Sequence, residues 1–238
     1  MPKKTIAVIM AAGSSRRMKN KTVKPFIIFK GKPLIWYSLY SFDKSSQISD
    51  IYVVVSEDIF QNPPKVLIRA LKKIGKFRGL IAGGTERCYS VYEALKKISP
   101  IYPKAYVAIH DAARPFITED IIDFICQAAY QYGAAAPGVP VVDTIKVINE
   151  NNEITSHLSR QDLKAIQTPQ IFLLSDLFKA YEQVLKAKRN VTDDTEVYAV
   201  LKKVIKILPG KDYLFKITYQ KDLKLARVFY KKKRKLWT

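Results

Sequence analysis

The chain has 238 residues, of which 48% are hydrophobic and 11% aromatic. This length and composition exclude a disordered protein and fit one large α/β domain or two small ones. Lysine and arginine total 41 against 21 aspartate and glutamate, a formal net charge of +20, which favours anionic partners such as nucleotides, phosphorylated metabolites, nucleic acid or anionic lipid. Cys88 and Cys126 are too few for a disulfide framework or a zinc site.

The amino-terminal segment lacks the features of a targeting signal. Behind Lys3 and Lys4 the apolar run is only about five residues long, shorter than the core of a signal peptide. No stretch approaches the roughly 20 apolar residues of a membrane span. We therefore expect a cytoplasmic protein with no membrane partner and with both cysteines reduced.

Strands and helices alternate over the first half of the chain. Short apolar runs predict strands at 6–10, 51–55, 80–82 and 105–109. Helical spacing predicts a helix with Pro33 in its first turn, then helices over 66–74, from about Glu86, and behind a capping Thr118. This order predicts a parallel sheet with right-handed crossovers. The loops 11–24, 83–87 and 110–115 should then gather at one sheet edge, where such folds bind ligands.

The pattern changes after Val139. Residues 141–148 and 154–158 predict two strands joined by a tight turn, a hairpin inserted at about 140–158 that a second subunit would cover. The remaining predicted elements are a helix over 174–185, strands over 204–208 and 215–218, and a helix over 220–230. Neither a linker nor a repeat interrupts the sequence, so we expect one domain spanning 1–238.

The opening loop is the segment best suited to hold a polyphosphate. Strand 6–10 ends at Ala11-Ala12-Gly13, where small residues let the backbone approach a ligand closely. Arg17 and Lys24 follow and supply fixed cations. A surface turn with solvated basic residues remains the alternative.

The order of short motifs along the chain indicates a family. No P-loop, G-x-G-x-x-G turn or G-x-S-x-G elbow is present. Instead the chain carries, in order, AAGSSRRM, Lys24-Pro25, GGTER, HDAARP, VPVVDTIK, Arg160 before IQTPQ, TDDTE and FKIT-x-x-x-DL. In these motifs, from about Ile6 to Ala226, it resembles the 2-C-methyl-D-erythritol 4-phosphate cytidylyltransferases.

The resemblance implies a fold and a reaction. The fold is an α/β Rossmann-like nucleotidyltransferase three-layer sandwich with a protruding β-arm, and the assembly is a homodimer with arm exchange. The reaction converts CTP and 2-C-methyl-D-erythritol 4-phosphate, with Mg²⁺, into 4-diphosphocytidyl-2-C-methyl-D-erythritol and pyrophosphate in the non-mevalonate isoprenoid pathway. Because the attacking phosphate is already ionised, such a site needs positioning and charge neutralisation rather than a nucleophilic side chain. The sequence offers no Ser/His/Asp or Cys/His set.

Matched motif by motif, the resemblance also implies site residues. The catalytic cations would be Arg17, Lys24 and Lys216. The CTP site would comprise Ala11, Ala12, Gly13, Gly84, Thr85, Ser90 and Asp111, with Asp111 also a candidate Mg²⁺ ligand. The polyol phosphate and the reacting phosphates would contact Arg114, Thr144, Arg160, Thr168 and Thr192. His110 would have a structural role.

The cytosine pocket should be lined largely by backbone. Backbone groups of 11–13 and of the Gly83-Gly84 loop would read the base, so Gly84→Val should exclude CTP and leave the fold intact. Two departures from the family pattern concern the neighbouring loops. Val23-Lys24-Pro25 stands where Pro-Lys-Gln is common, and Thr85 stands where an acid is common.

Several alternatives stay open. The nearest is a cytidylyltransferase for ribitol 5-phosphate or another polyol phosphate, although such relatives usually have Ala-Gly-Gly and His-Asp-Ala-Val-Arg-Pro where this chain has Ala-Ala-Gly and His-Asp-Ala-Ala-Arg-Pro. An RNA-binding protein would account for the charge and the 14 tyrosines, but no RNA-binding module is present and no nucleic acid partner is expected. The run 192–196 fits a helix start, a substrate contact or both, and the basic run 231–235 is interpreted as a solvated tail.

Overall fold

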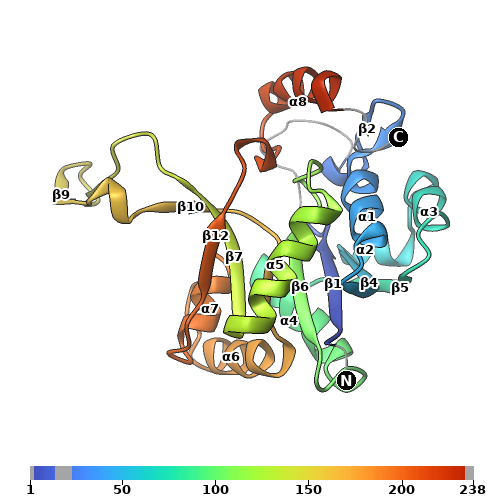
Figure 1. Cartoon of the computed structure of the whole chain (residues 1–238), viewed down its shortest axis with the longest axis horizontal. Coiled ribbons are helices and arrows are strands. Elements are labelled where there is room, and N and C mark those ends of the chain that lie inside the picture. The colour runs from blue at the N-terminus through green and yellow to red at the C-terminus, as the bar shows by residue number, and fades with distance from the viewer. Residues whose placement is uncertain (1–2, 14–22, 234–238) are drawn as a thin grey trace.

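In the part of the chain that the structure describes, eight strands form one mixed sheet at the centre of the protein (Figure 1). The computed structural model describes residues 3–13 and 23–233, the last two as backbone only. The strand order is β10-β7-β11-β6-β1-β4-β5, with β12 also paired to β7. The strands are β1 (Thr5–Met10), β4 (Ile48–Val55), β5 (Phe77–Ala82), β6 (Tyr106–Asp111), β7 (Ala134–Pro140), β10 (Lys164–Ile166), β11 (Gln170–Leu173) and β12 (Lys206–Pro209).

Parallel pairing brings three strand ends to the same edge of the sheet. β1 lies between β4 and β6, and Met10 is level with both Val54 and Asp111. β5 continues the parallel set, with Ala82 level with Val55 of β4. The loops that follow β1, β5 and β6 therefore start at one edge, as the strand-helix alternation predicts. The sheet is mixed because β11 runs antiparallel to both β6 and β7.

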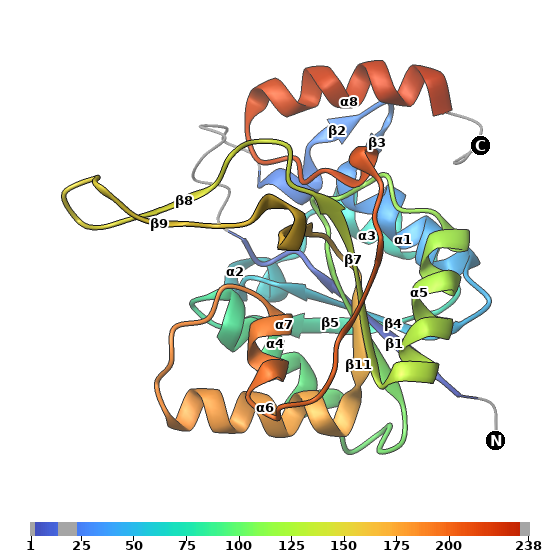
Figure 2. The same ribbon diagram turned by 60° about the vertical axis from the view of Figure 1, so that its left-hand side comes forward.

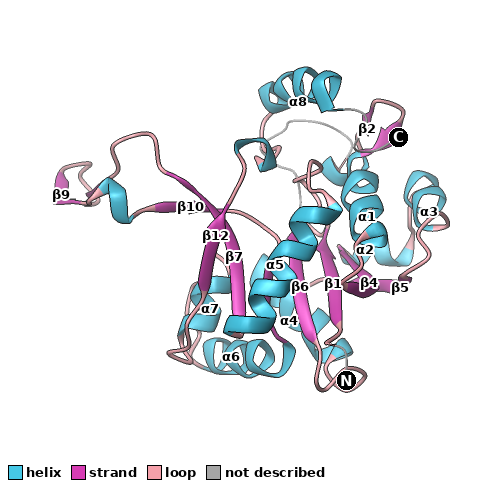
Figure 3. Cartoon of the chain, in the orientation of Figure 1, coloured by secondary structure: helices cyan, strands magenta, loops and turns pink. Residues whose placement is uncertain are grey.

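Helices cover both faces of the sheet (Figure 3). They are α1 (Leu34–Lys44), α2 (Glu57–Gln61), α3 (Lys65–Leu71), α4 (Arg87–Ile98), α5 (Glu119–Tyr132), α6 (Leu174–Lys186), α7 (Asp194–Ala199) and α8 (Gln220–Lys233). Alternate residues of β1 serve the two faces: Ala7 and Ile9 pack with α1, α3 and α5, whereas Ile6 and Val8 pack with α4, α6 and α7. The predicted three-layer sandwich is confirmed. None of these described helices has the length and apolar character needed to cross a bilayer.

A third, smaller apolar core lies beneath α8. It comprises Phe29, Leu34, Tyr37, Phe116, Ile217 and Ala226. Phe29 belongs to the hairpin of β2 (Ile28–Phe29) and β3 (Lys32–Pro33), which follows the 3₁₀ helix η2 (Lys24–Phe26). This core therefore joins α8 both to the segment that follows Lys24 and to the segment that follows Lys216.

A hairpin leaves the body of the protein (Figure 2). β8 (Lys146–Ile148) and β9 (Ile154–His157) pair with each other, and neither pairs with another strand of the described chain. Ile148 and Ile154 are 52% and 57% exposed. The predicted β-arm is confirmed, although its first strand begins at Lys146 rather than near Val141. The chain returns to the sheet through the 3₁₀ helix η3 (Arg160–Asp162).

Some elements differ from those that the sequence predicts. The strand predicted over 215–218 is wrong: within the described chain this segment joins no sheet, because Phe215 and Ile217 pack into the third core instead. β7 has no strand pattern in the sequence, since its Ala, Pro and Gly residues have low strand propensity and the strand depends on burial between its neighbours. Thr118 precedes α5 as predicted, but its side chain makes no capping hydrogen bond.

Candidate active site

A cavity of about 540 Å³ lies at the edge where β1, β5 and β6 end. It is lined by Met10, Ala11, Ala12, Gly13, Lys24, Pro25, Gly84, Thr85, Glu86, Arg87, Ser90, Asp111, Ala113 and Lys216. Nine of the site residues implied by the family resemblance are therefore in one place. A concave site at the carboxyl ends of parallel strands is the usual position for a nucleotide in such a fold.

Close backbone approach shapes the wall formed by the loops that follow β1 and β5. Ala11 and Gly83 donate backbone hydrogen bonds to Val54 O and Val55 O, both at 2.7 Å. A Cβ on Gly83 would lie 2.8 Å from the Ser90 hydroxyl and 3.0 Å from Ala12 Cβ. The two loops can therefore lie this close only because residue 83 has no side chain.

Gly84 has a packing role in addition to lining the cavity. A Cβ at this position would lie 2.5 Å from Tyr89 Cβ, within the first turn and a half of α4. Ser90 Oγ donates to Gly84 O at 3.2 Å or Glu86 O at 2.9 Å. The loop and the start of α4 are thus packed tightly, and the expectation that a valine at residue 84 leaves the fold intact is not supported by this geometry.

Lys24 lies in the cavity wall at the start of η2. Its residue exposure is only 8%, low for a lysine. Pro25 follows it in the 3₁₀ turn, and the ring restricts the backbone there. Although Val23-Lys24-Pro25 differs from the common family pattern Pro-Lys-Gln, Lys24 still lies at the cavity.

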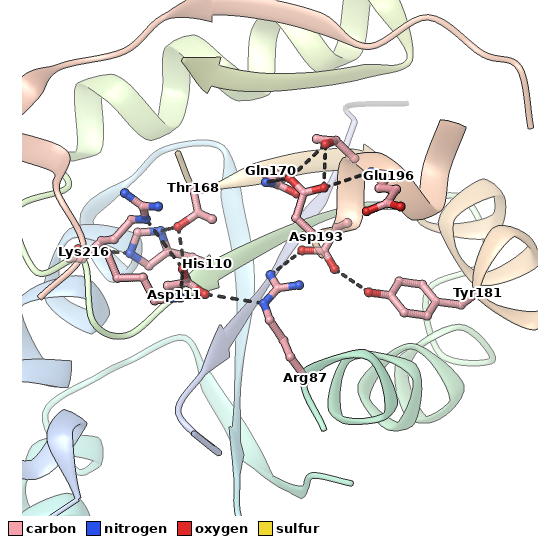
Figure 4. Close-up of polar contacts among 12 residues, drawn as sticks. Arg87, His110, Asp111, Thr168, Gln170, Tyr181, Asp193, Glu196 and Lys216 are labelled. Atoms are coloured by element: carbon pink, nitrogen blue, oxygen red, sulfur yellow. Dashed lines mark hydrogen bonds and ion pairs between the residues drawn. The ribbon is translucent and has the colours of Figure 1, made fainter. Parts of the chain in front are cut away.

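Asp111 is the centre of a cluster of charges (Figure 4). Lys216 Nζ lies 2.9 Å from its Oδ2, Arg114 Nε lies 3.6 Å from the same oxygen, and Arg87 Nε lies 3.7 Å from Oδ1. Burial by itself would raise the pKa of Asp111, but Lys216, Arg87 and Arg114 outweigh it and hold the pKa well below its ordinary value. The carboxylate is ionised at every physiological pH and organises cations around the cavity.

His110 and Thr168 support Asp111 from inside the fold. Asp111 N donates to Thr168 Oγ1 at 3.1 Å, and His110 Nδ1 and Nε2 lie 3.1 and 3.2 Å from Thr168 Oγ1 and Arg114 O. Since a carbonyl only accepts, Nε2 carries the proton and Nδ1 accepts from the threonine hydroxyl. Burial lowers the pKa of His110 to about 4, so the ring is neutral. Thr168 thus lies behind Asp111 rather than on the cavity surface.

Arg87 connects Asp111 to a second buried carboxylate, that of Asp194. Arg87 Nη2 donates to Asp194 Oδ2 at 2.5 Å, and Tyr181 donates its hydroxyl to Asp194 Oδ1 at 2.5 Å. Asp194 is fully buried at the start of α7. Neither Arg87 nor Asp194 is among the predicted site residues, although they lie within the motifs GGTER and TDDTE. In the sequence, the only indication of a role for Arg87 and Asp194 is that each is a charged residue within a motif. The two residues come together only in the folded protein.

Other predicted site residues lie away from this cavity. Thr144 is exposed on the connection into the arm, and Arg160 donates from Nη1 to Val142 O at 3.1 Å at the arm's base. Thr192 lines a separate cavity of about 660 Å³. Its amide and hydroxyl both donate to Glu196 at 2.8 Å, and Asp193 accepts from Glu196 N, so the helix-start interpretation of 192–196 is confirmed. Arg17 lies outside the described residues.

The cavity offers limited protein ligands for a metal ion. Within residues 3–13 and 23–233 no three His, Cys, Asp or Glu side chains gather to form a cage. Asp111 and Glu86 are the carboxylates in the wall. Magnesium commonly takes one or two carboxylates and completes its shell with substrate phosphates and water, so this donor set fits a metal shared with a bound triphosphate.

Comparison with known proteins assigns the family. The model of the IspD family, 2-C-methyl-D-erythritol 4-phosphate cytidylyltransferase, matches residues 5–232. A relative of that name from Clostridium beijerinckii is 38% identical over 226 residues, covering 94% of this chain and 97% of the relative. One from Caldanaerobacter subterraneus subsp. tengcongensis is also 38% identical, with 95% and 98% covered.

Solved structures agree with this assignment. The 4-diphosphocytidyl-2C-methyl-D-erythritol synthase of Anaerococcus prevotii has a TM-score of 0.82 at 27% identity and covers 97% of each chain. The 2-C-methyl-D-erythritol 4-phosphate cytidylyltransferase of Thermus thermophilus has a TM-score of 0.74 at 26% identity, covering 94% of this chain and 98% of that one. The chain belongs to the IspD family of 2-C-methyl-D-erythritol 4-phosphate cytidylyltransferases.

Proposed function

We propose that this protein transfers CMP from CTP to 2-C-methyl-D-erythritol 4-phosphate, giving 4-diphosphocytidyl-2-C-methyl-D-erythritol and pyrophosphate in the non-mevalonate isoprenoid pathway. The observation that carries the proposal is one cavity in which the small residues 11–13 and the cations Lys24, Arg87 and Lys216 share the wall. The small residues leave room for a nucleotide, and the cations suit its phosphates. Family membership over nearly the whole chain supports the same reaction.

The reaction is a displacement at the α-phosphorus of CTP. An oxygen of the methylerythritol phosphate bonds to this phosphorus, the bond to the bridging oxygen breaks, and its electron pair leaves with pyrophosphate. Lys24 and Lys216 would neutralise the charge on the α-phosphoryl oxygens during this step. Because Asp111 holds Lys216 at 2.9 Å, the lysine is ordered before a substrate binds, which lowers the cost of reorganisation.

A divalent cation, Mg²⁺ by preference, would add charge neutralisation on the triphosphate. Asp111 is the residue that would hold it, together with phosphate oxygens and water. The ionised state of Asp111, set by its three cationic neighbours, keeps the carboxylate available as a ligand. Arg87 and Arg114 keep its orientation fixed from the two sides.

We also propose that the protein acts in the cytoplasm as a homodimer in which each subunit contributes residues to its partner's site. Thr144 and Arg160 lie on or beside the arm and outside the nucleotide cavity, so they would reach a substrate phosphate in the partner's site. The arm exposes Ile148 and Ile154, and a symmetric partner would bury these side chains. Both substrates are highly charged metabolites that membranes retain in the cytoplasm.

The direct test measures pyrophosphate release with CTP, Mg²⁺ and a panel of polyol phosphates. We expect release with 2-C-methyl-D-erythritol 4-phosphate, little with ribitol 5-phosphate, and loss of activity when the divalent cation is chelated. Each reaction is confirmed by mass spectrometry of the CDP-linked product. Preference for ribitol 5-phosphate would replace the proposed substrate, and no release with any polyol phosphate would reject the activity.

A further inference from the structure

We propose that Asp222 is a positioning residue that holds Lys216 in place beside Asp111, acting through the backbone that joins Lys216 to α8. The inference rests on the proposed function, in which Lys216 acts on the nucleotide phosphates. Asp222 is the acid of the motif FKIT-x-x-x-DL. It lies outside the cavity wall described above, so contact with the nucleotide does not account for it.

The Asp222 carboxylate closes a turn immediately beyond Lys216. Its Oδ2 accepts hydrogen bonds from Thr218 N at 2.7 Å and from Tyr219 N at 2.8 Å. Thr218 Oγ1 in turn donates to Lys216 O at 3.2 Å. Hydrogen bonds to an ionised acceptor are stronger than neutral ones, so this one carboxylate fixes two successive peptide units next to the lysine.

The position of Asp222 in α8 explains its hydrogen bonds to the backbone N–H groups of Thr218 and Tyr219. It is the third residue of a 14-residue helix and the one acid in the first turn. The first N–H groups of a helix and of the residues before it lack intrahelical acceptors. An acid at the third position can accept from the backbone N–H that precedes the helix, and its charge is favourable near the positive end of the helix dipole. Asp222 therefore determines how the chain enters α8.

The helix that carries Asp222 is itself anchored to the protein body. The ring of Phe229 lies 5.0 Å from that of Phe116 and 4.9 Å from that of Tyr213. The ring of Tyr230 lies 5.6 Å from that of Phe29, in the hairpin that follows Lys24. A turn fastened to α8 is thus fastened to a packed core and is not a free loop.

Lys216 needs such support because its side chain is partly solvated. The side chain is 38% exposed, and a lysine has a long, flexible stem. Ile217 N donates to Ala113 O at 2.9 Å, which holds the chain to the body at one point. The turn closed by Asp222 supplies a second point directly afterwards. Together they restrict the backbone from which Lys216 reaches Asp111.

The test compares three variants of the full-length enzyme. Asp222→Ala removes both hydrogen bonds and should lower kcat about tenfold or more while changing the KM for CTP less than about threefold. Asp222→Asn keeps one acceptor oxygen and should lose less. Asp212→Ala, which removes an exposed carboxylate in the 3₁₀ helix η4 (Asp212–Leu214) on the other side of Lys216, should behave as the wild type.

A double-mutant cycle separates positioning from general destabilisation. In a Lys216→Ala background, Asp222→Ala should lower kcat little further, because the residue it positions is gone. An equal factor in both backgrounds, or an unchanged kcat in the single variant, overturns the inference. A Lys216→Ala enzyme as active as the wild type would instead contradict the proposed role of Lys216.

Hydrogen exchange gives a readout independent of catalysis. The amides of Thr218 and Tyr219 should exchange faster in Asp222→Ala than in Asp212→Ala, whereas amides of the central strand β1 should not change. Unchanged exchange at both amides overturns the inference even if the protein has no cytidylyltransferase activity. If the protein has no such activity, faster exchange confined to the amides of Thr218 and Tyr219 still supports the role of Asp222 in fixing this turn.

Discussion

Lys216 Nζ lies 2.9 Å from Asp111 Oδ2, although the lysine lies in a late loop and the aspartate ends a central strand of the sheet. This pair joins the third core to the parallel sheet at the cavity wall. Because Arg87 and Arg114 flank the same carboxylate, Asp111 is unsuited to act as a general base. Its chemistry is to hold cations, and in the proposed function these would include a divalent metal.

Replacing Lys24 with methionine should reduce turnover far more than CTP affinity. The side chain lines the cavity from a nearly buried position, where a charge that acts mainly on the transition state contributes about 10²-fold or more to kcat. Steady-state kinetics and direct CTP titration measure the two effects. Lys73→Met, which changes an exposed lysine beyond α3, is the control. If CTP affinity falls and kcat does not change, Lys24 contributes only to binding CTP in the ground state.

Mixing two inactive variants tests whether the arm completes the partner's site. Lys24→Ala and Arg160→Ala homodimers should each be nearly inactive. If Arg160 serves the partner, about half of the dimers formed after free exchange are mixed, and each has one intact site, so activity recovers to about a quarter of the wild type. Subunit exchange is verified separately by labelled protein. If no activity returns although exchange is complete, Arg160 acts within its own subunit.

The protein should lose stability in mild acid because of His110. Its pKa is lowered to about 4 by burial, whereas an unfolded histidine has a pKa near its ordinary value of about 6.5. Below that value the unfolded chain binds a proton that the folded chain does not, so the free energy of unfolding falls as pH drops from about 6.5 towards 4, by up to about 3 kcal/mol.

Urea unfolding between pH 7.5 and pH 4.5 measures this effect. His110→Asn should weaken the pH dependence, and His157→Asn, which changes the exposed histidine of the arm, should leave it as in the wild type. If the free energy of unfolding depends on pH in His110→Asn as it does in the wild type, groups other than His110 cause this dependence.

Adding one methyl group at Gly84 should destabilise the protein. A Cβ there would lie 2.5 Å from Tyr89 Cβ, and relieving the overlap requires the loop or the start of α4 to move, at a cost of about 1–3 kcal/mol. Thermal unfolding with and without CTP measures stability and binding together. Gly79→Ala is the matched control, because a Cβ on Gly79 meets nothing within 4 Å. A Gly84→Ala protein as stable as the control would show that the loop adjusts freely.

Local sequence was sufficient for the elements whose pattern is set by near neighbours. The apolar run before Ala11 forms the buried strand β1, and the amphipathic spacing of α4, α5 and α6 forms the helical layers, since these patterns follow from the strand and helix periods alone. The parallel order that they imply brings the ends of β1, β5 and β6, where the three predicted site loops begin, to one edge. Nine of the predicted residues line one cavity for that reason.

Long-range packing decided the rest. The segment 215–218 has the composition of a strand but enters the third core, where Ile217 is fully buried beneath α8 together with aromatic side chains. Arg87 meets Asp194, and Lys216 meets Asp111, only after helices and strands far apart in the chain have docked. A charge pair between distant segments has no local period. Its energy depends on burial and separation, which exist only in the folded protein.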